Sequence, residues 1–175
     1  MENKYLKESA ELVRKVFTES EGEESGNLVK SLVEEIRSKK YYLPELEFIM
    51  VNEKDEAIGY VMFSRFHLEG KYEDELLIIT PVAVKTELQR QHISKEIIEY
   101  GFDVAKKLGF KAVLVEGNPQ NYRSRGFDSS YKYGIEASES IHLPHPDCLM
   151  VKALEDGALE HISGLLDYSF YECLI

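Results

Sequence analysis

Cysteine and long apolar runs are scarce in this chain of 175 residues, and each scarcity excludes a class of protein. The two cysteines, Cys148 and Cys173, have no CxxC spacing, so a disulfide framework is not indicated and a reducing compartment is expected. No stretch approaches the roughly 18 uninterrupted apolar residues that a membrane span requires. The first residues, 1–12, contain no apolar segment of the signal-peptide type. We therefore expect a cytoplasmic protein without a membrane partner.

Positive charge is also in deficit, because 32 acidic residues outweigh 21 basic ones and the net charge is −11. A surface this negative repels phosphate backbones, so no nucleic-acid partner is expected. Hydrophobic residues make up 43% of the chain and charged residues 30%, which is the ordinary mix of a globular protein. The length fits one domain, which we expect to span residues 1–175.

Two helices are expected at the start of the chain. Apolar side chains recur at helical spacing in residues 4–18 and again in residues 27–38. The segment between them, residues 19–26, is acidic and contains two glycines, which is typical of a solvated loop. Asn27 is the expected N-cap of the second helix.

The apolar pattern then changes to short strands. Three of them, expected to form an antiparallel meander, are residues 46–51, 57–68 and 76–84. Pro81 lies inside the third strand and marks an irregularity, because proline cannot donate to a strand ladder. A long helix at 92–108 and a strand at 111–115 follow, so a crossover should make the flanking strands parallel. Shorter elements are expected at 120–124 (a helical turn), 148–154 and 162–168 (strands).

Four features in residues 80–127 resemble the GNAT family of acyl-CoA-dependent N-acetyltransferases. In chain order they are VAV at 82–84, LQRQHIS at 88–94, AVLV at 112–115 and GNPQNYRSRGF at 117–127. The last one is similar to the G-[HN]-P-x-x-Y-x-x-x-G-F ending of one bacterial branch of predicted N-acetyltransferases. With the upstream pieces that also fit this branch, the resemblance covers nearly the whole chain.

The resemblance implies a fold class and an activity. The fold is α/β (α+β), a three-layer α/β/α domain with a mixed, mostly antiparallel, splayed sheet that holds acetyl-CoA as co-substrate. The activity is transfer of the acetyl group to a primary amine, small-molecule or peptide, by direct attack in a ternary complex. No cysteine lies in the matching motifs to carry an acyl group. A non-catalytic module of this fold that binds a metabolite or protein partner is the alternative, and a homodimer stays open.

The resemblance also assigns roles to individual residues. The pantetheine arm would pair with strand backbone, and the pyrophosphate would lie on the loop before the long helix, whose first turn offers N–H groups and partial positive charge. The implied cofactor-binding residues are Val82, Val84, Gln89, Arg90, Gln91, His92, Ile93, Ser94 and Asn118. Tyr122 is the implied catalytic residue, a general acid that protonates the departing thiolate. Packing under its loop is the alternative role of Tyr122.

The phosphate loop departs from the family pattern Q/R-x-x-G-x-G/A at both glycine positions. This chain has His92 and Ser94 there. Glycine lets the backbone approach a phosphate and adopt positive φ, and a Cβ obstructs both. Two interpretations stay open: a protonated His92 contacts the pyrophosphate itself, or the site is weakened.

Several further groups could serve chemistry, although solvation explains each of them as well. Candidates for the base that deprotonates the amine are His67, Glu73, Asp74, Glu75 and Glu116. Candidates for holding CoA phosphates are Lys85, Lys95, Arg123 and Arg125. The H-x2-H-x2-C spacing of His142, His145 and Cys148 lacks a fourth ligand at a familiar distance and contains two prolines, so no metal site is expected.

Overall fold

The computed structural model describes residues 1–174, which divide into two compact units. Unit 1 contains Met1–Ser64, Thr80–Gly101 and the C-terminal residues from Tyr171 onward. Unit 2 contains Arg65–Ile79 and Phe102–Phe170.

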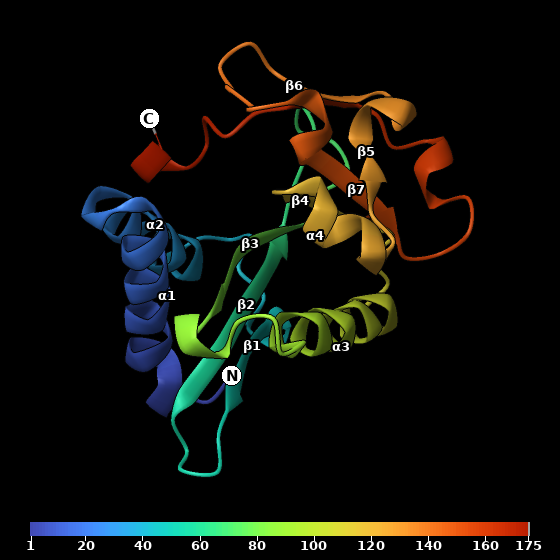
Figure 1. Ribbon diagram of the computed structural model, residues 1–175. Coiled ribbons are helices and arrows are strands. Elements are labelled where there is room, and N and C mark those ends of the chain that lie inside the picture. The colour runs from blue at the N-terminus through green and yellow to red at the C-terminus, as the bar shows by residue number, and fades with distance from the viewer. Residues whose placement is uncertain (175) are drawn as a thin grey trace. The chain divides into compact units, whose positions relative to one another are not determined.

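Residues 1–174 contain a six-stranded sheet with the strand order β1-β2-β3-β4-β7-β5 (Figure 1). Its strands are β1 (Glu47–Val51), β2 (Ala57–Arg65), β3 (Leu76–Val84), β4 (Ala112–Glu116), β5 (Asp128–Ser129) and β7 (Leu149–Ala153). The pairs β1–β2, β4–β7 and β5–β7 are antiparallel, whereas β3 and β4 are parallel. The predicted fold class, α/β with a mixed, mostly antiparallel sheet, is therefore confirmed. Two further strands, β6 (Ile135–Ala137) and β8 (Gly164–Leu166), pair in parallel as a small second sheet.

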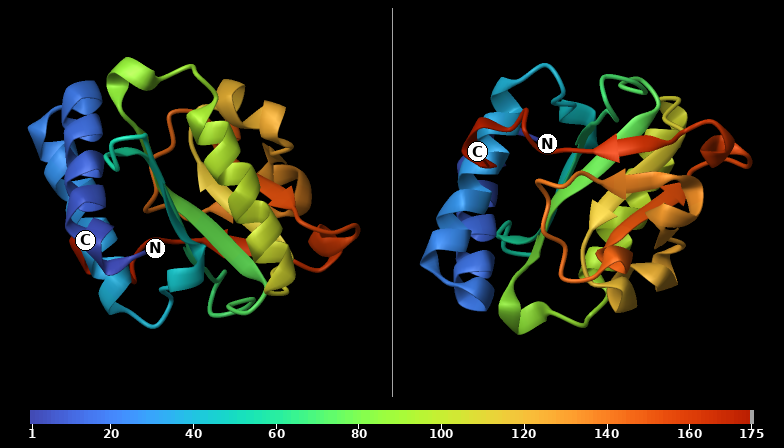
Figure 2. Two further views of the ribbon diagram at one scale, coloured as in Figure 1. Left: turned by 90° about the horizontal axis from the view of Figure 1, so that it is seen from below. Right: turned by 90° about the horizontal axis from the view of Figure 1, so that it is seen from above.

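The two helices of unit 1, α1 (Leu6–Glu21) and α2 (Glu23–Ser38), lie side by side (Figures 1 and 2). The predicted loop at 19–26 is wrong, because Gly22, with φ of 102°, is the only residue between the helices. Close helix packing is the physical reason: a Cβ on Gly26 would lie 2.0 Å from Thr18 Oγ1. Gly22 rather than Asn27 precedes the first turn of α2. Acidic residues in that turn interact favourably with the helix dipole.

The core of unit 1 forms where α1 and α2 meet strands β1 and β2. Both faces of β2 are covered by other parts of the protein, since residues 59–64 are all buried. The fully buried apolar side chains of this unit include Val13, Val33, Ile36, Leu46, Tyr60, Val61, Met62 and Phe63. The third strand of the meander, β3, has the predicted bounds 76–84.

In unit 2, strand β4 lies between β3 and β7. Its parallel pairing with β3 comprises Leu76↔Ala112, Leu77↔Val113 and Ile78↔Leu114, although β4 continues to Glu116. This arrangement confirms the predicted crossover through the long helix, which is α3 (Ile93–Lys107). Strands β5 and β6 have two and three residues, too few to show a period in the sequence. The predicted strand at 148–154 begins one residue later, since Cys148 is half-buried in the 3-10 turn before β7.

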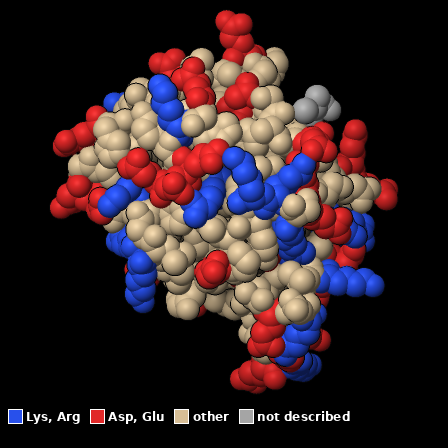
Figure 3. Space-filling model, turned by 180° about the vertical axis from the view of Figure 1, so that it is seen from behind, with Lys and Arg blue, Asp and Glu red and all other residues tan. Residues whose placement is uncertain are grey.

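The surface carries charge of both signs, and acidic and basic side chains lie interspersed on the face shown in Figure 3. No helix formed by residues 1–174 is both long and apolar enough to cross a membrane.

Candidate active site

The loop before α3, in unit 1, has a backbone conformation that the sequence did not lead us to expect. Arg90 and His92 both adopt left-handed φ values, 63° and 64°. The carbonyl of His92 accepts a hydrogen bond from the Glu96 amide at 3.0 Å, which starts the helix. The Cβ of His92 therefore opposes positive φ without preventing it. Histidine is among the non-glycine residues enriched in this region, at a cost of roughly 1–2 kcal/mol.

Side chains in this loop divide into exposed and anchored ones. The first four candidate residues, Gln89, Arg90, Gln91 and His92, are exposed. Ile93 is half-buried and packs towards β2, because its Cγ2 would lie 2.8 Å from a Cβ on Gly59. Ser94 is half-buried as well. Glycine at position 59 thus permits the close approach of helix α3 to the strand, and Ile93 fixes where the helix begins.

Tyr122, in unit 2, lies at the end of a short helix, α4 (Pro119–Tyr122). Asn118 caps this helix, since its Oδ1 accepts a hydrogen bond from the Gln120 amide at 2.9 Å. The Tyr122 ring packs edge-on against Phe127, with 5.6 Å between ring centroids. It also fills the space beside Gly117, where a Cβ would lie 2.6 Å from Tyr122 Cε2. The turn Gly117–Phe127 thereby holds the ring in one place.

The protonation state of Tyr122 follows from this packing. Burial raises the pKa of Tyr122 above its ordinary value of 10.0, and the positive charge of Arg125 opposes that shift. The Arg125 guanidinium lies 5.4 Å from the centre of the tyrosine ring. A raised pKa means that the hydroxyl keeps its proton throughout the neutral range, as a proton donor must.

The basic candidates for phosphate contacts mostly have partners of their own. Lys85 and Lys95 lie 3.8 Å from Glu56 and Glu99, respectively. Arg123 pairs with Asp147 at 3.2 Å. These ion pairs are partly solvent-exposed and weak, so an anionic ligand can displace them at small cost.

The candidate bases differ in the charge of their partners. Asp74 forms an ion pair with Arg65, and the carboxylate oxygen Oε2 of Glu75 lies 2.8 Å from His161 Nε2. His67 Nδ1 accepts a hydrogen bond from the Gly70 amide at 3.1 Å. Glu116 instead accepts a hydrogen bond from the neutral hydroxyl of Tyr168 at 2.9 Å.

Tyr168 is a residue that the sequence analysis missed. It is one of 11 tyrosines and belongs to no recognised motif. It follows β8, 52 residues after Glu116, so no spacing in the sequence links the two.

No group of three or more metal-binding side chains occurs within residues 1–174. In the histidine-rich segment before β7, the ring of His145 accepts a hydrogen bond from the Asp147 amide at 3.1 Å. This bond caps the 3-10 turn Pro146–Cys148, which is a structural role.

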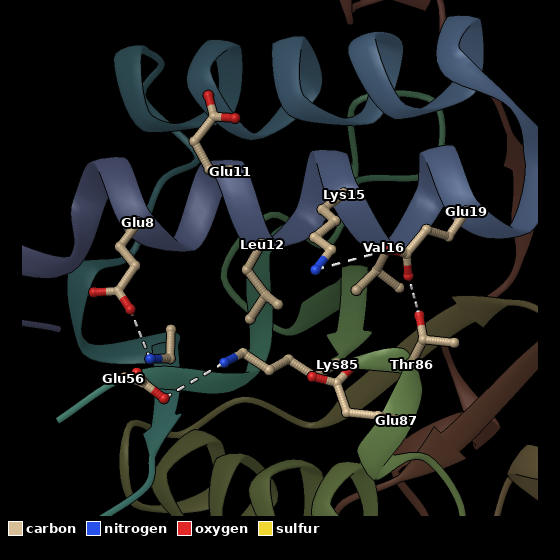
Figure 4. A pocket seen from close by; sticks show the side chains of 11 residues that line it. Glu8, Glu11, Leu12, Lys15, Val16, Glu19, Glu56, Lys85, Thr86 and Glu87 are labelled. Atoms are coloured by element: carbon tan, nitrogen blue, oxygen red, sulfur yellow. Dashed lines mark hydrogen bonds and ion pairs between the residues drawn. The ribbon is translucent and has the colours of Figure 1, made fainter. Parts of the chain in front are cut away.

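A pocket of about 310 Å³ opens in unit 1 between α1 and the segment that follows β3 (Figure 4). Its charged lining residues are Glu8, Glu11, Lys15, Glu19, Glu56, Lys85 and Glu87. The carboxylates are largely engaged: Glu8 accepts a hydrogen bond from the Ala57 amide at 2.7 Å, and Thr86 donates to Glu19. These contacts connect α1 to the start of β2 and to the segment that follows β3.

Comparisons with known proteins agree with this architecture. The model of the Acetyltransferase (GNAT) family matches residues 10–129. The uncharacterized N-acetyltransferase YhbS of Escherichia coli (strain K12) is 26% identical over 126 residues, which are 70% of this chain and 71% of YhbS. Because the family model matches more than half of the residues, the chain belongs to the GNAT acetyltransferase family.

Solved structures show the same fold. The crystal structure of YhbS from Escherichia coli in complex with CoA has a TM-score of 0.83 at 22% identity, covering 96% of this chain and 86% of that one. A GNAT family acetyltransferase from Brucella melitensis, in complex with acetyl-CoA, has a TM-score of 0.72 at 16% identity, covering 100% and 95%.

Proposed function

We propose that this protein transfers an acetyl group from acetyl-CoA to a primary amine by direct attack in a ternary complex. The observation that carries the proposal is the loop before α3, where His92 adopts the left-handed conformation that suits a glycine. The backbone at position 92 thus has the conformation that a glycine of the family pattern adopts without strain, although the glycine is absent. Family membership and the CoA complexes of the two similar structures support the same co-substrate.

In this proposal unit 1 binds the cofactor. The backbone of Val82 and Val84 pairs with the pantetheine arm, and the loop at 89–94 holds the pyrophosphate. The first turn of α3 contributes the positive end of its dipole. Arg90 and His92 are exposed and add side-chain charge at the same loop when His92 is protonated. Asn118, in unit 2, retains its side-chain NH₂ for a polar contact while its Oδ1 caps α4.

Tyr122 acts in this proposal as the general acid. When the amine nitrogen bonds to the thioester carbon, the carbon–sulfur bond breaks and the thiolate takes the phenolic proton. The thiol has a reference pKa near 8.5, well below that of the buried phenol, so the transfer depends on close positioning. The packing of Tyr122 against Gly117 and Phe127 supplies a fixed position. We propose that residues 1–175 act as one domain.

Calorimetric titration with acetyl-CoA tests the proposal first. We expect saturable binding to the full chain, followed by release of CoA when primary amines such as spermidine, ethanolamine and a lysine-containing peptide are added. Binding without release in any of these reactions, or in a wider amine panel, favours the non-catalytic alternative. Absence of binding rejects acetyl-CoA as the co-substrate.

A further inference from the structure

Glu116 stands out because its carboxylate has a neutral partner and lies beside the Tyr122 turn. We propose that Glu116 is the catalytic base that deprotonates the amine acceptor, and that Tyr168 positions it. This inference rests on the proposed acetyl transfer. It adds a second proton-transfer group, on the amine side of the reaction, to the acid on the thiol side.

The strand geometry puts the two groups on opposite faces. Glu116 is the last residue of β4, and Gly117, at the bend that follows, continues the pairing beside β7, because its amide donates a hydrogen bond to the Cys148 carbonyl at 2.9 Å. Side chains of successive residues in extended backbone point to opposite faces of a sheet. The Tyr122 ring fills the space on the Gly117 side, 2.6 Å from where a Cβ would stand. The carboxylate of Glu116 therefore projects from the other face at the same strand end.

Direct attack needs this separation. The amine adds to one face of the planar thioester carbon, whereas the sulfur that leaves is a substituent in that plane, so a base and an acid are needed at different positions. Glu116 at the end of β4 and Tyr122, whose ring packs beside Gly117, meet that requirement without interfering with each other's proton.

The partner of Glu116 leaves its proton-accepting capacity intact. Within residues 1–174 its carboxylate forms no ion pair, and Tyr168 Oη donates to Oε2 at 2.9 Å. One hydrogen bond occupies one of about four acceptor positions of a carboxylate, so Oε1 stays available to an amine. An ion pair with lysine or arginine, such as Asp74 forms with Arg65, would instead oppose protonation.

Tyr168 is well suited to hold Glu116 in place. Its ring packs edge-on against Phe66, with 6.2 Å between centroids, and Phe66 is only 1% exposed. Phe66 also contacts Phe170 at 5.3 Å, so the segment after β8 is fixed at two points. The rigid ring thus restricts a carboxylate that would otherwise rotate freely in solvent.

The proton balance of the step is complete. Glu116 takes a proton from the ammonium form of the acceptor, which frees the nitrogen lone pair to attack the thioester carbon. As the nitrogen–carbon bond forms and the carbon–sulfur bond breaks, the thiolate takes the Tyr122 proton and the nitrogen releases its second proton to water. The products are the acetylated amine and CoA, and both side chains return to their starting states by exchange with water.

The test compares Glu116→Gln and Tyr168→Phe with the control Glu136→Gln, an exposed glutamate on β6 in the same unit. The rate of CoA release is measured with spermidine, ethanolamine and the lysine peptide from pH 7 to pH 10, and acetyl-CoA affinity is measured by calorimetry. In Glu116→Gln we expect kcat/KM for the amine to fall by roughly 10²–10⁴-fold at pH 7, with unchanged acetyl-CoA affinity. The loss should shrink towards pH 10, because alkylamines with a pKa near 10.4 lose their proton in solution there.

The positioning role of Tyr168 is tested by the kcat and the pH profile of Tyr168→Phe. Tyr168→Phe should lower kcat by about fivefold, the factor that corresponds to one ordinary hydrogen bond, and keep the shape of the parent pH profile. Glu136→Gln should behave as the parent. A parent-like rate in Glu116→Gln, or a loss of equal size at every pH, overturns the assignment of Glu116 while the proposed transfer stands. A parent that binds acetyl-CoA but releases no CoA with any amine overturns both.

Discussion

Arg37 donates two hydrogen bonds to the carboxylate of Glu47, from Nε at 2.9 Å and from Nη2 at 2.6 Å. The Glu47 side chain is 0% exposed and also accepts hydrogen bonds at 2.6 Å from the hydroxyls of Tyr42 and Tyr60. Arg37 further donates to the Leu6 carbonyl at 2.8 Å. One buried ion pair therefore connects α1, α2, β1 and β2 within unit 1.

Replacing one partner of this pair should destabilise the protein strongly. In Arg37→Met the Glu47 carboxylate stays buried without its counter-charge, which typically costs about 3–5 kcal/mol. The free energy of unfolding, measured by urea denaturation, should fall by that amount. Glu45→Gln, at an exposed position two residues before Glu47, should change it by no more than about 0.5 kcal/mol. If the free energy of unfolding of Arg37→Met falls by less than about 1 kcal/mol, the ion pair contributes little to stability.

The contact at Gly26 should be sensitive to a single methyl group. A Cβ there would lie 2.5 Å from the Arg14 carbonyl oxygen and 2.9 Å from the Thr18 amide nitrogen, and backbone cannot move aside easily. We expect Gly26→Ala to lower the free energy of unfolding by roughly 1–3 kcal/mol, although alanine favours helices. Glu24→Ala, at an exposed position of the same helix, is the matched control. Stabilisation in both variants would contradict the close packing of α1 and α2.

Tyr122→Phe removes the proposed acid and keeps the ring. We expect kcat to fall by roughly 10²–10⁴-fold with little change in acetyl-CoA affinity. Because burial raises the pKa of Tyr122 above 10.0, the hydroxyl stays protonated below that pH. The parent should therefore show no loss of kcat from tyrosine ionisation between pH 7 and pH 9. Tyr131→Phe, at an exposed tyrosine of the same unit, should match the parent. An unchanged kcat in Tyr122→Phe, with chemistry rate-limiting, removes this residue from the mechanism.

His92→Gly should separate backbone strain from side-chain charge. Glycine relieves the left-handed strain, which costs roughly 1–2 kcal/mol. It also raises the conformational entropy of the unfolded chain, which lowers the free energy of unfolding by about 0.5–1 kcal/mol. We therefore expect a stabilisation of up to about 1 kcal/mol in urea denaturation. Gln91→Gly, at a neighbouring position without positive φ, has no strain to relieve and should be destabilised by about 0.5–1 kcal/mol.

The same variant tests the role of imidazole charge in binding. If the imidazole contacts the pyrophosphate, His92→Gly should weaken acetyl-CoA affinity, measured by calorimetry, relative to the parent. If the parent binds weakly and His92→Gly restores binding, the side chain obstructs the site.

Local patterns in the sequence predicted the sheet and the long helix well. Strand β3 has the predicted bounds, and α3 differs from the prediction by one residue at each end. These elements bury continuous apolar runs or one helical face, so their periodicity is visible in the chain itself. The turn at Tyr122 was predicted as well, because proline and glycine mark both of its ends.

The errors have a common cause in long-range packing. Residues 19–26 are acidic and glycine-containing, which indicates a loop locally, but the contact of Gly26 with Thr18 continues both helices up to Gly22. His92 lacks the freedom of glycine, but its backbone is held by the helix start and by the anchoring of Ile93 against Gly59. At both positions, contacts with other segments outweigh a local preference of about 1 kcal/mol for a different backbone conformation.

The sequence by itself determined the order of the elements, the mixed sheet and the positions of the family motifs, because each depends on residues close together in the chain. Only the tertiary structure decided that Arg37 meets Glu47, that His92 adopts a left-handed backbone and that Tyr168 contacts Glu116. The last pair is separated by 52 residues. Such contacts arise from the packing of whole elements, which fixes side-chain distances that no local spacing encodes.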